Sequence, residues 1–462
     1  MSQENKLRVS RPFGMSDKLG YMIGNFGNDL TFFLASNYFM VFYTSIGVSA
    51  ATVGTLFGIA RLVDAFTDVG MGVIADNSPT TSIGKFKPWL RRMAFPVGLA
   101  SALMYNSFII DWSPTAKVIY MFVTYLLWGS IFYTSINIPY GSLASVISGK
   151  AEDRANLSTF RSMGSTLIQF SLGFLVPFFA YSANGEVLQD NFMWLGIALG
   201  LAAAVCYLAC YKMVEERVEL PQAAKFSGKE MLKDLGELIK DRGFLGLMFS
   251  TMFMLAGLIS LGQLLQYMYL DVFQNTRILP IATAGMSVSA LAIAPFVSSI
   301  TKRFGKKEAG TFSLIGAGSI YIIAFFLKIE SPLVFAILVL AAGLVMGYYT
   351  MAMYAYVTDV IDDFYIKRGT RKDGTIYSVY SFTRKVGQAI AGFLAGALLT
   401  AIGYQAGVAE QTTEVANNIY NVGTLLPGAL LLAAGLILLF MYPLNKKKVA
   451  ENARIIEAEL GE

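Results

Sequence analysis

The stretch Arg61-Leu62-Val63-Asp64-Ala65-Phe66-Thr67-Asp68 decides how the rest of this sequence is interpreted. It lies in an apolar run long enough to cross a bilayer, for which about 20 residues suffice. A helix places Asp64 and Asp68 one turn apart on one face, with Arg61 a turn earlier. Ionisable groups at membrane depth are costly unless they pair or line a wet cavity. We therefore expect a site for a coupling cation, Na⁺ or H⁺, with a structural salt bridge as the alternative.

The composition indicates a polytopic membrane protein. Of 462 residues, 55% are hydrophobic and 15% are charged. The sequence contains no histidine, which excludes histidine metal sites, a Ser/His/Asp triad and a histidine proton relay. No nucleophile–base set or metal cluster stands out, so we expect no enzyme, no cofactor and no metal beyond a possible Na⁺. The net charge of +5 lies in loops and predicts topology, not nucleic-acid binding.

Hydropathy over a window of about 19 residues predicts about twelve membrane spans. Their limits are near 19–45, 51–76, 89–111, 116–148, 158–183, 191–213, 243–273, 280–301, 309–328, 332–361, 375–403 and 421–443. The expected fold is therefore all-α and membrane-spanning. Lysine and arginine gather on alternate connections, so the positive-inside rule predicts a cytoplasmic-membrane protein with both termini in the cytoplasm.

Two motifs recur at nearly equal offsets. Gly84-Lys85-Phe86-Lys87 is echoed 221 positions later by Gly305-Lys306-Lys307, and Phe160-Arg161-Ser162-Met163-Gly164 is echoed 223 positions later by Thr383-Arg384-Lys385-Val386-Gly387. This predicts a duplicated six-helix unit. Two such pseudo-symmetric halves around a central cavity are typical of alternating-access transporters, although a channel stays open as an alternative.

The expected domain organisation follows from this duplication. The predicted parts are an N-terminal half (1–213), a cytoplasmic linker (214–242), a C-terminal half (243–445) and a cytoplasmic tail (446–462). Within the linker, residues 228–240 have apolar side chains at helical spacing, which predicts a short amphipathic helix on the membrane face.

The first and fourth spans carry the polar side chains expected of a sugar site. Asn25, Asn28 and Asp29 occupy positions i, i+3 and i+4, so they share a face and can bind sugar hydroxyls. Hydrogen bonds between helices are the alternative for them. In the fourth span, Tyr133 and Asn137 are one turn apart with Thr134 beside them. There the alternative is interfacial aromatics with a plain kink at a proline.

Four further charged residues lie in or near apolar spans. Lys385 lies about ten residues into its span, or about 15 Å at 1.5 Å per residue, so we expect it to reach the cavity. Arg161 and Arg384 lie nearer the ends, where snorkelling to the interface is the alternative. Asp359 lies at a cytoplasmic end, where we expect it to pair with a basic loop as a gate latch or a plain salt bridge. Arg61, Arg384 and Asp359 form the expected gating and charge network.

These motifs resemble the glycoside–pentoside–hexuronide:cation symporters, the melibiose-permease branch of the major facilitator superfamily. The carrying residues are Arg61-x-x-Asp64-Ala-x-x-Asp68, Gly84-Lys-Phe-Lys-Pro-Trp89, Asn137-Ile-Pro-Tyr140, and Tyr377-Ser-Val near Lys385. The likeness extends over nearly the whole chain. It implies the major facilitator fold and transport of a small sugar or glycoside.

The resemblance also implies roles for individual residues. Asp64 and Asp68 would hold the coupling cation, with Thr134 as a further oxygen ligand and Asn137 near both cation and sugar. Asp29 would bind sugar hydroxyls together with Tyr133 and Arg161, and Lys385 would lie near both sites. With the asparagines of the first and fourth spans, the expected sugar site comprises Asp29, Asn25, Asn28, Tyr133, Asn137, Arg161 and Lys385.

Three positions depart from the melibiose-permease pattern. This chain has Asn28 in place of lysine, Asn137 in place of aspartate and Gly141 in place of tryptophan. A hard cation prefers several oxygens and negative charge, so the loss of the third carboxylate favours H⁺ over Na⁺ without deciding between them. The sugar likewise stays open among glycosides, pentosides and hexuronides.

The sequence therefore predicts a monomeric secondary transporter, surrounded by membrane lipid, that imports a sugar or glycoside with H⁺ or Na⁺. Two alternatives remain. A lipid or lysolipid carrier of the same superfamily branch would take up amphiphiles. A sugar sensor that does not transport would bind sugar without uphill flux.

Overall fold

The computed structural model describes residues 9–182, 185–218, 236, 238–369, 373–408 and 410–460. Within these ranges the protein is helical, and its only β-type pairings are two isolated bridges, Thr81 with Gly84 and Tyr181 with Val187. The chain divides into two compact units. The N-terminal unit comprises Met1–Phe226 with Gln405–Ala409, and the C-terminal unit comprises Ser227–Tyr404 with Glu410–Glu462.

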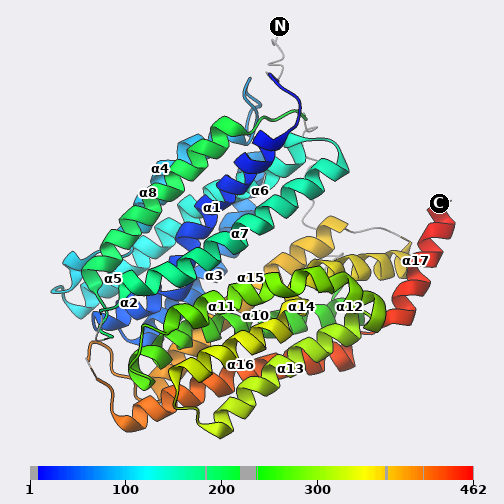
Figure 1. Ribbon diagram of the computed structural model, residues 1–462. Helices are drawn as coiled ribbons and strands as arrows, with labels where there is room; N and C mark the ends of the chain where they lie inside the picture. The colour runs from blue at the N-terminus through cyan, green and yellow to red at the C-terminus, as the bar shows by residue number, and fades with distance from the viewer. Residues whose placement is uncertain are drawn as a thin grey trace. The chain divides into compact units, whose positions relative to one another are not determined.

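The helices of the N-terminal unit are drawn from blue to green in Figure 1. They are α1 (Met15–Asn37), α2 (Phe39–Ser45), α3 (Ala50–Asp76), α4 (Lys87–Leu103), η1 (Ser107–Ile109), α5 (Pro114–Leu126), the π-helix η2 (Leu127–Tyr133), α6 (Thr134–Ile147), α7 (Ala151–Ala180) and α8 (Gln189–Met213). Here α1 packs against both α7 and α8, and α4 packs against α8. The backbones of α4 and α8 meet at Gly98 and Gly200, where a Cβ on either residue would collide with the other's carbonyl oxygen. Such close backbone contact is typical of membrane helices that meet at small residues.

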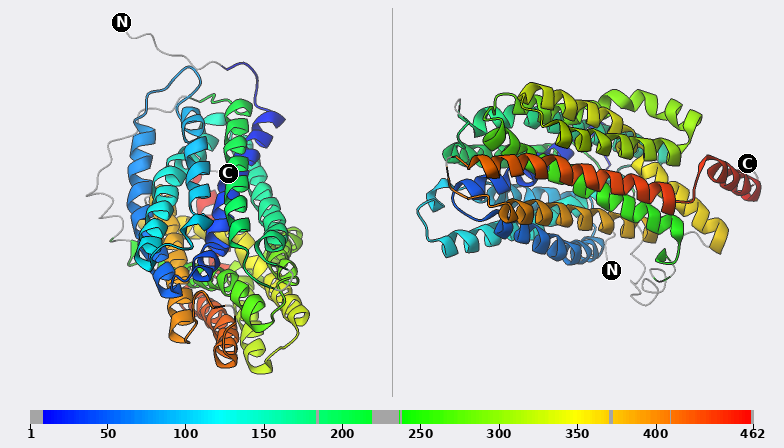
Figure 2. Two further views of the ribbon diagram at one scale, coloured as in Figure 1. Left: turned by 90° about the vertical axis from the view of Figure 1, so that its left-hand side faces the viewer. Right: turned by 90° about the horizontal axis from the view of Figure 1, so that it is seen from below.

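The C-terminal unit is also a bundle of long helices. They are α10 (Arg242–Tyr267), the π-helix η3 (Met268–Val272), α11 (Leu279–Ile293), η4 (Ala294–Phe296), α12 (Val297–Phe304), α13 (Lys306–Leu327), α14 (Pro332–Arg368), α15 (Asp373–Ala401), α16 (Thr413–Met441) and α17 (Lys446–Leu460). Helix α16 packs against both α10 and α13, as two further views show (Figure 2). Helix α17 runs at a steep angle to α13 and α16 (Figure 1).

Every predicted span falls on a helical segment. Seven of these segments satisfy a length-and-hydropathy criterion for membrane spans among the described residues. Charges interrupt several others, including α3 and α15. Several predicted limits differ from the helices: α4 ends at Leu103, not near 111, and α16 begins at Thr413, not near 421. In addition, the span predicted at 280–301 is broken at Ala294–Phe296. Pro295 explains that break, because proline lacks an N–H and clashes with the preceding turn.

The repeated motifs occupy matching places in the packing of the two units. A Cβ on Gly164 of α7 would come within 2.7 Å of Met22 Cγ in α1. A Cβ on Gly387 of α15 would come within 2.8 Å of the Met252 carbonyl oxygen in α10. In each unit, therefore, a glycine one turn after the motif's arginine lets its helix approach the first helix of the same unit.

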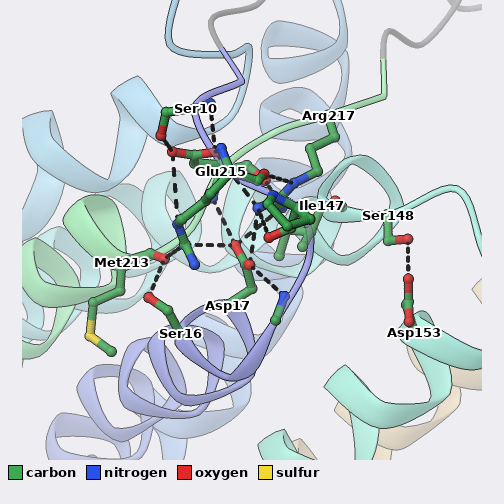
Figure 3. Close-up of polar contacts among 12 residues, drawn as sticks. Ser10, Ser16, Asp17, Ile147, Ser148, Asp153, Met213, Glu215 and Arg217 are labelled. Atoms are coloured by element: carbon green, nitrogen blue, oxygen red, sulfur yellow. Dashed lines mark hydrogen bonds and ion pairs between the residues drawn. The ribbon is translucent and has the colours of Figure 1, made fainter.

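The segment after α8 is held against the N-terminal unit by charged groups (Figure 3). Arg217 donates from Nη1 and Nη2 to the two carboxylate oxygens of the buried Asp17, over 3.1 and 3.0 Å, and its Nη1 also donates to the Ile147 carbonyl oxygen. A two-pronged arginine–carboxylate pair is among the stronger charge-assisted contacts in proteins. The starts of α1 and of the predicted linker are thus tied together.

The neighbouring Glu216 binds a helix start. Its buried carboxylate accepts hydrogen bonds from the backbone N–H groups of Lys85, Phe86 and Lys87, over 2.8, 2.8 and 2.7 Å. These amides lie at the N-terminus of α4, where the helix dipole favours an anion. Burial raises the pKa of Glu216 above its ordinary value, and these hydrogen bonds oppose the increase. Most of the amphipathic helix predicted at 228–240 lies outside the described residues.

Candidate functional site

The three charged residues of the opening stretch lie on one face of α3, and the two carboxylates bind side chains of η2 and α6. Arg61 Nη1 lies 2.9 Å from Asp64 Oδ2, and the Ser130 hydroxyl donates to Asp64 Oδ1 over 2.6 Å. One turn further along α3, the Thr134 hydroxyl donates to Asp68 Oδ1 over 2.7 Å. The structure therefore pairs each of the two carboxylates with a hydroxyl of the opposite helix.

Ser130 lies in the π-helix η2, and Thr134 is the first residue of α6 directly after it. Each hydrogen-bonded pair is separated by 66 positions in sequence, so the spacing of four between the carboxylates matches the spacing of four between the hydroxyls. The η2 backbone comes close to α3 at Gly129, where a Cβ would lie 4.0 Å from Asp64 Oδ1. Single π-type turns within α-helices are found frequently at functional sites.

A second polar cluster joins α1 to α7. Asn25 Nδ2 donates to Asp29 Oδ2 over 2.7 Å, and Arg161 Nε donates to Asn25 Oδ1 over 3.0 Å. The Ser165 hydroxyl also donates to Asp29 Oδ2, and the Arg161 guanidinium lies over the Tyr140 ring at 5.4 Å. Carboxylate, amide, guanidinium and hydroxyl groups together offer the donors and acceptors that sugar hydroxyls require.

Tyr133 connects the two clusters. Its ring stacks on Phe32 of α1 with centroids 6.1 Å apart, and the guanidinium of Arg61 lies 5.8 Å from that Phe32 ring. The carboxylates of α3 and the polar group of α1 and α7 are therefore neighbours within one unit.

Two predicted site residues lie outside these hydrogen-bonded clusters. Asn28 is buried and accepts a hydrogen bond at Oδ1 from the Tyr207 hydroxyl of α8 over 2.8 Å. It therefore faces α8, while Asn25 and Asp29 face α7. Asn137 is partly buried in α6, and among the described residues it makes no hydrogen bond to Asp64 or Asp68. Asn137 is thus not joined to the carboxylate pair in this structure.

The remaining predicted residues belong to the C-terminal unit. Lys385 is partly buried in α15. Arg384 Nη1 donates to the Tyr354 hydroxyl over 2.8 Å, and its guanidinium lies 5.9 Å from the centre of that ring. Asp359 pairs with Lys306 Nζ at 2.6 Å. The partner of Asp359 is thus a lysine of the basic Gly305-Lys306-Lys307 motif, and the pair ties α14 to the start of α13 inside one unit.

Sequence reasoning missed two residues of the N-terminal unit that touch the predicted carboxylates, Ser130 and Ser165. A signal existed for each of them. Ser130 precedes Thr134 by four positions, which repeats the spacing of Asp64 and Asp68, and Ser165 follows Arg161 by one helical turn. A serine in an apolar span is a weak signal because it often bonds only to its own helix, as Ser142 does to the Ile138 carbonyl oxygen.

The family model and the similar proteins both indicate a sugar transporter. Residues 20–446 match the MFS/sugar transport protein family. The chain is 30% identical to the glucuronide carrier protein homolog of Escherichia coli (strain K12), over 94% of this chain and 93% of the relative. It is 27% identical to the putative glycoside/cation symporter YagG of the same organism, over 95% and 94%. These matches confirm the resemblance to glycoside–pentoside–hexuronide:cation symporters.

The solved structures agree on the fold. A crystal structure of a D-xylose–proton symporter superposes with a TM-score of 0.64 at 13% sequence identity, covering 93% of this chain and 97% of that one. At this low identity the likeness establishes the major facilitator fold alone. The chain belongs to the MFS/sugar transport protein family and is an integral membrane transporter, not an enzyme.

Proposed function

We propose that this protein carries a sugar or glycoside into the cytoplasm together with H⁺ or Na⁺. The observation that carries the proposal is the meeting of two polar clusters at Tyr133 inside apolar helices. One cluster has the carboxylates for a cation, and the other has the mixed donors and acceptors for a sugar. The glycoside/cation symporter among its relatives supports this combination.

The coupling mechanism follows from charge. Asp64 is buried, Asp68 and Arg61 are partly buried, and together they hold two carboxylates and one guanidinium. One monovalent cation neutralises these three groups, and a neutral site favours the closure that carries the sugar across the membrane. Because the sugar residues Asp29, Tyr133 and Arg161 lie beside this site, each ligand tightens binding of the other to the same extent.

The proposed molecule is a monomer in the cytoplasmic membrane, with both termini in the cytoplasm and two six-helix halves that alternate access. Its predicted parts remain residues 1–213, 214–242, 243–445 and 446–462. The basic residues of the Lys85–Arg92 and Lys306–Lys307 connections support this orientation.

The test is binding of a sugar panel to the purified protein at two pH values, with and without Na⁺. The panel contains methyl galactoside, methyl xyloside and phenyl glucuronide. We expect one of them to bind more tightly with Na⁺ or at a particular pH, and to accumulate uphill in proteoliposomes. In the Asp64→Asn variant this accumulation should stop while the wild type retains it.

Three outcomes would count against the proposal. Uphill uptake that survives in the Asp64→Asn variant would remove the cation site from α3. If no sugar binds under any condition, transport of a lysolipid should be measured instead, because a lipid carrier is the alternative within this fold. Binding without uphill flux in the wild type would indicate a sugar sensor.

A further inference from the structure

We propose that Ser130 is a ligand of the coupling cation and that, with Ser130 in place, the site selects Na⁺. This inference rests on the proposed function and adds to it both the identity of the ion and a residue that determines it. The sequence favoured H⁺ because Asn137 replaces a carboxylate. In the structure, the Ser130 hydroxyl donates to Asp64 Oδ1 across the helix interface over 2.6 Å.

The oxygens of the site form two matched layers. Asp64 Oδ1 and Ser130 Oγ make the first layer, and Asp68 Oδ1 and Thr134 Oγ1 make the second, with contacts of 2.6 and 2.7 Å. Both hydroxyls are buried. A hydroxyl has two lone pairs as well as its proton, so rotation about the C–O bond turns it from a donor to a carboxylate into a ligand for a cation.

The Arg61 side chain keeps the first layer open. Its Nη1 binds Asp64 Oδ2, while its Nη2 donates to the Tyr125 hydroxyl over 3.3 Å. The guanidinium therefore neutralises the outer oxygen of Asp64 and leaves Oδ1 directed at Ser130.

The chemistry of the four oxygens favours Na⁺. Hard cations bind carboxylate and neutral oxygens together, and a proton needs only one carboxylate. Here two hydroxyls face two carboxylates at the same helical spacing. Together they supply the several oxygens that a dehydrated Na⁺ requires. Ser130 thus compensates for the carboxylate missing at Asn137.

The experiment compares three variants of the full-length purified protein with the wild type. Ser130→Ala removes the oxygen, and Ser130→Thr retains it. The control Ser142→Ala removes a hydroxyl of the same span that donates to the Ile138 carbonyl oxygen of its own helix. Na⁺ alone is titrated while thermal unfolding is followed, which measures ion binding without any sugar. Binding of the panel sugar that the wild type accepts is then measured against Na⁺ concentration.

We expect the half-saturating Na⁺ concentration to rise about tenfold in Ser130→Ala, which corresponds to about 1.4 kcal/mol. Ser130→Thr should stay close to the wild type, and Ser142→Ala should match it. Sugar affinity at saturating Na⁺ should change little in any variant. A merely structural role of Ser130 would lower the unfolding temperature without changing its dependence on Na⁺.

The inference is overturned if Na⁺ stabilises Ser130→Ala as strongly as the wild type, or if the wild type responds to pH and not to Na⁺. In the second case cation-coupled symport still stands, with H⁺ as the ion. If the wild type binds no sugar but Na⁺ stabilises it through Ser130, the proposed substrate fails while the ion site remains.

Discussion

Arg161 and Arg384 occupy equivalent positions in the two repeated motifs, 223 residues apart, yet their surroundings differ in kind. Arg161 binds the amide oxygen of Asn25, next to the carboxylate of Asp29. Arg384 binds the hydroxyl of Tyr354 and lies over its ring. The two repeats therefore both keep an arginine at this position, but its partner differs. In the N-terminal unit the arginine binds an acidic cluster, and in the C-terminal unit it binds an aromatic side chain.

The helices that face these arginines show the same difference. Taking Met22 and Met252 as equivalent, the positions in α10 that correspond to Asn25, Asn28 and Asp29 hold only leucine and isoleucine, at Leu255, Leu258 and Ile259. Likewise, 221 positions after Arg61, Asp64 and Asp68 the span contains Ala282, Gly285 and Ser289. The two units thus pack their helices in equivalent ways, but at these positions only the N-terminal unit has ionisable side chains.

The largest expected effect tests whether ion coupling belongs to the N-terminal unit alone. Asp68→Asn removes a carboxylate of the cation site, and we expect cation-stimulated sugar binding to fall by at least about 100-fold, the scale of about 3 kcal/mol for removing one member of a buried charged set. Asp359→Asn breaks the ion pair with Lys306 in the C-terminal unit. Its cation dependence should stay unchanged even if its transport rate changes. Titration of sugar binding against cation concentration measures both, and an equal loss in the two variants would contradict this division.

A smaller effect is expected on sugar affinity, and it should differ between substitutions of the two equivalent arginines, Arg161 and Arg384. Arg161→Gln removes a charged hydrogen bond in the α1–α7 cluster, and we expect the sugar dissociation constant to rise about 10- to 100-fold, from about 1.5–3 kcal/mol. Arg384→Gln should raise it less than Arg161→Gln does, because its partner is an aromatic hydroxyl. Isothermal titration calorimetry with the sugar accepted by the wild type measures both constants. Equal increases would mean that the C-terminal unit contributes as much to the sugar site.

The smallest expected effect is on the pH dependence of unfolding, and it concerns the two repeated basic motifs, Gly84–Lys87 and Gly305–Lys307. The N-terminal loop is held by Glu216 through backbone amides, and the C-terminal loop is held by Asp359 through the Lys306 side chain. Burial makes the pKa of Glu216 higher in the folded protein than in the unfolded chain. The folded protein therefore binds more protons, so this group makes the free energy of unfolding decrease as pH rises from the ordinary value of 4.5 through the raised pKa.

The corresponding variant is Glu216→Gln, which cannot titrate. We expect the part of the pH dependence due to Glu216, about 1.4 kcal/mol per unit of raised pKa, to disappear from its unfolding curve. Thermal unfolding from pH 4.5 to pH 8 measures this, with Glu215→Gln as the neighbouring control, because hydrogen bonds from Ser10 and Arg11 outweigh burial and lower the pKa of Glu215. If unfolding of the wild type and Glu216→Gln depended on pH in the same way, the buried carboxyl would not be the titrating group.

The positions of the spans could be predicted from the sequence because polar groups are costly in hydrocarbon. The same cost singles out Asp64 and Asp68, whose role as a cation site stays a prediction. The sequence did not predict contacts that depend on the exact backbone geometry of a helix. Nothing in Leu127–Tyr133 predicts a π-helix, and without that element Ser130 has no evident partner. Asn28 was grouped correctly by helical spacing with Asp29, but the width of a helical face allowed it to bind Tyr207 on another neighbour.

The close crossing of α4 and α8 at Gly98 and Gly200 has a consequence for biosynthesis. Helix α4 is made long before its partner, since 102 residues separate the two glycines (200 − 98). At about 5–20 residues per second, the small-residue face of α4 waits roughly 5–20 s for α8 to leave the ribosome. During that interval lipid or an insertion factor must cover the surface around Gly98. A bulky side chain at Gly200 would therefore act late, by stopping an already inserted α4 from finding its place.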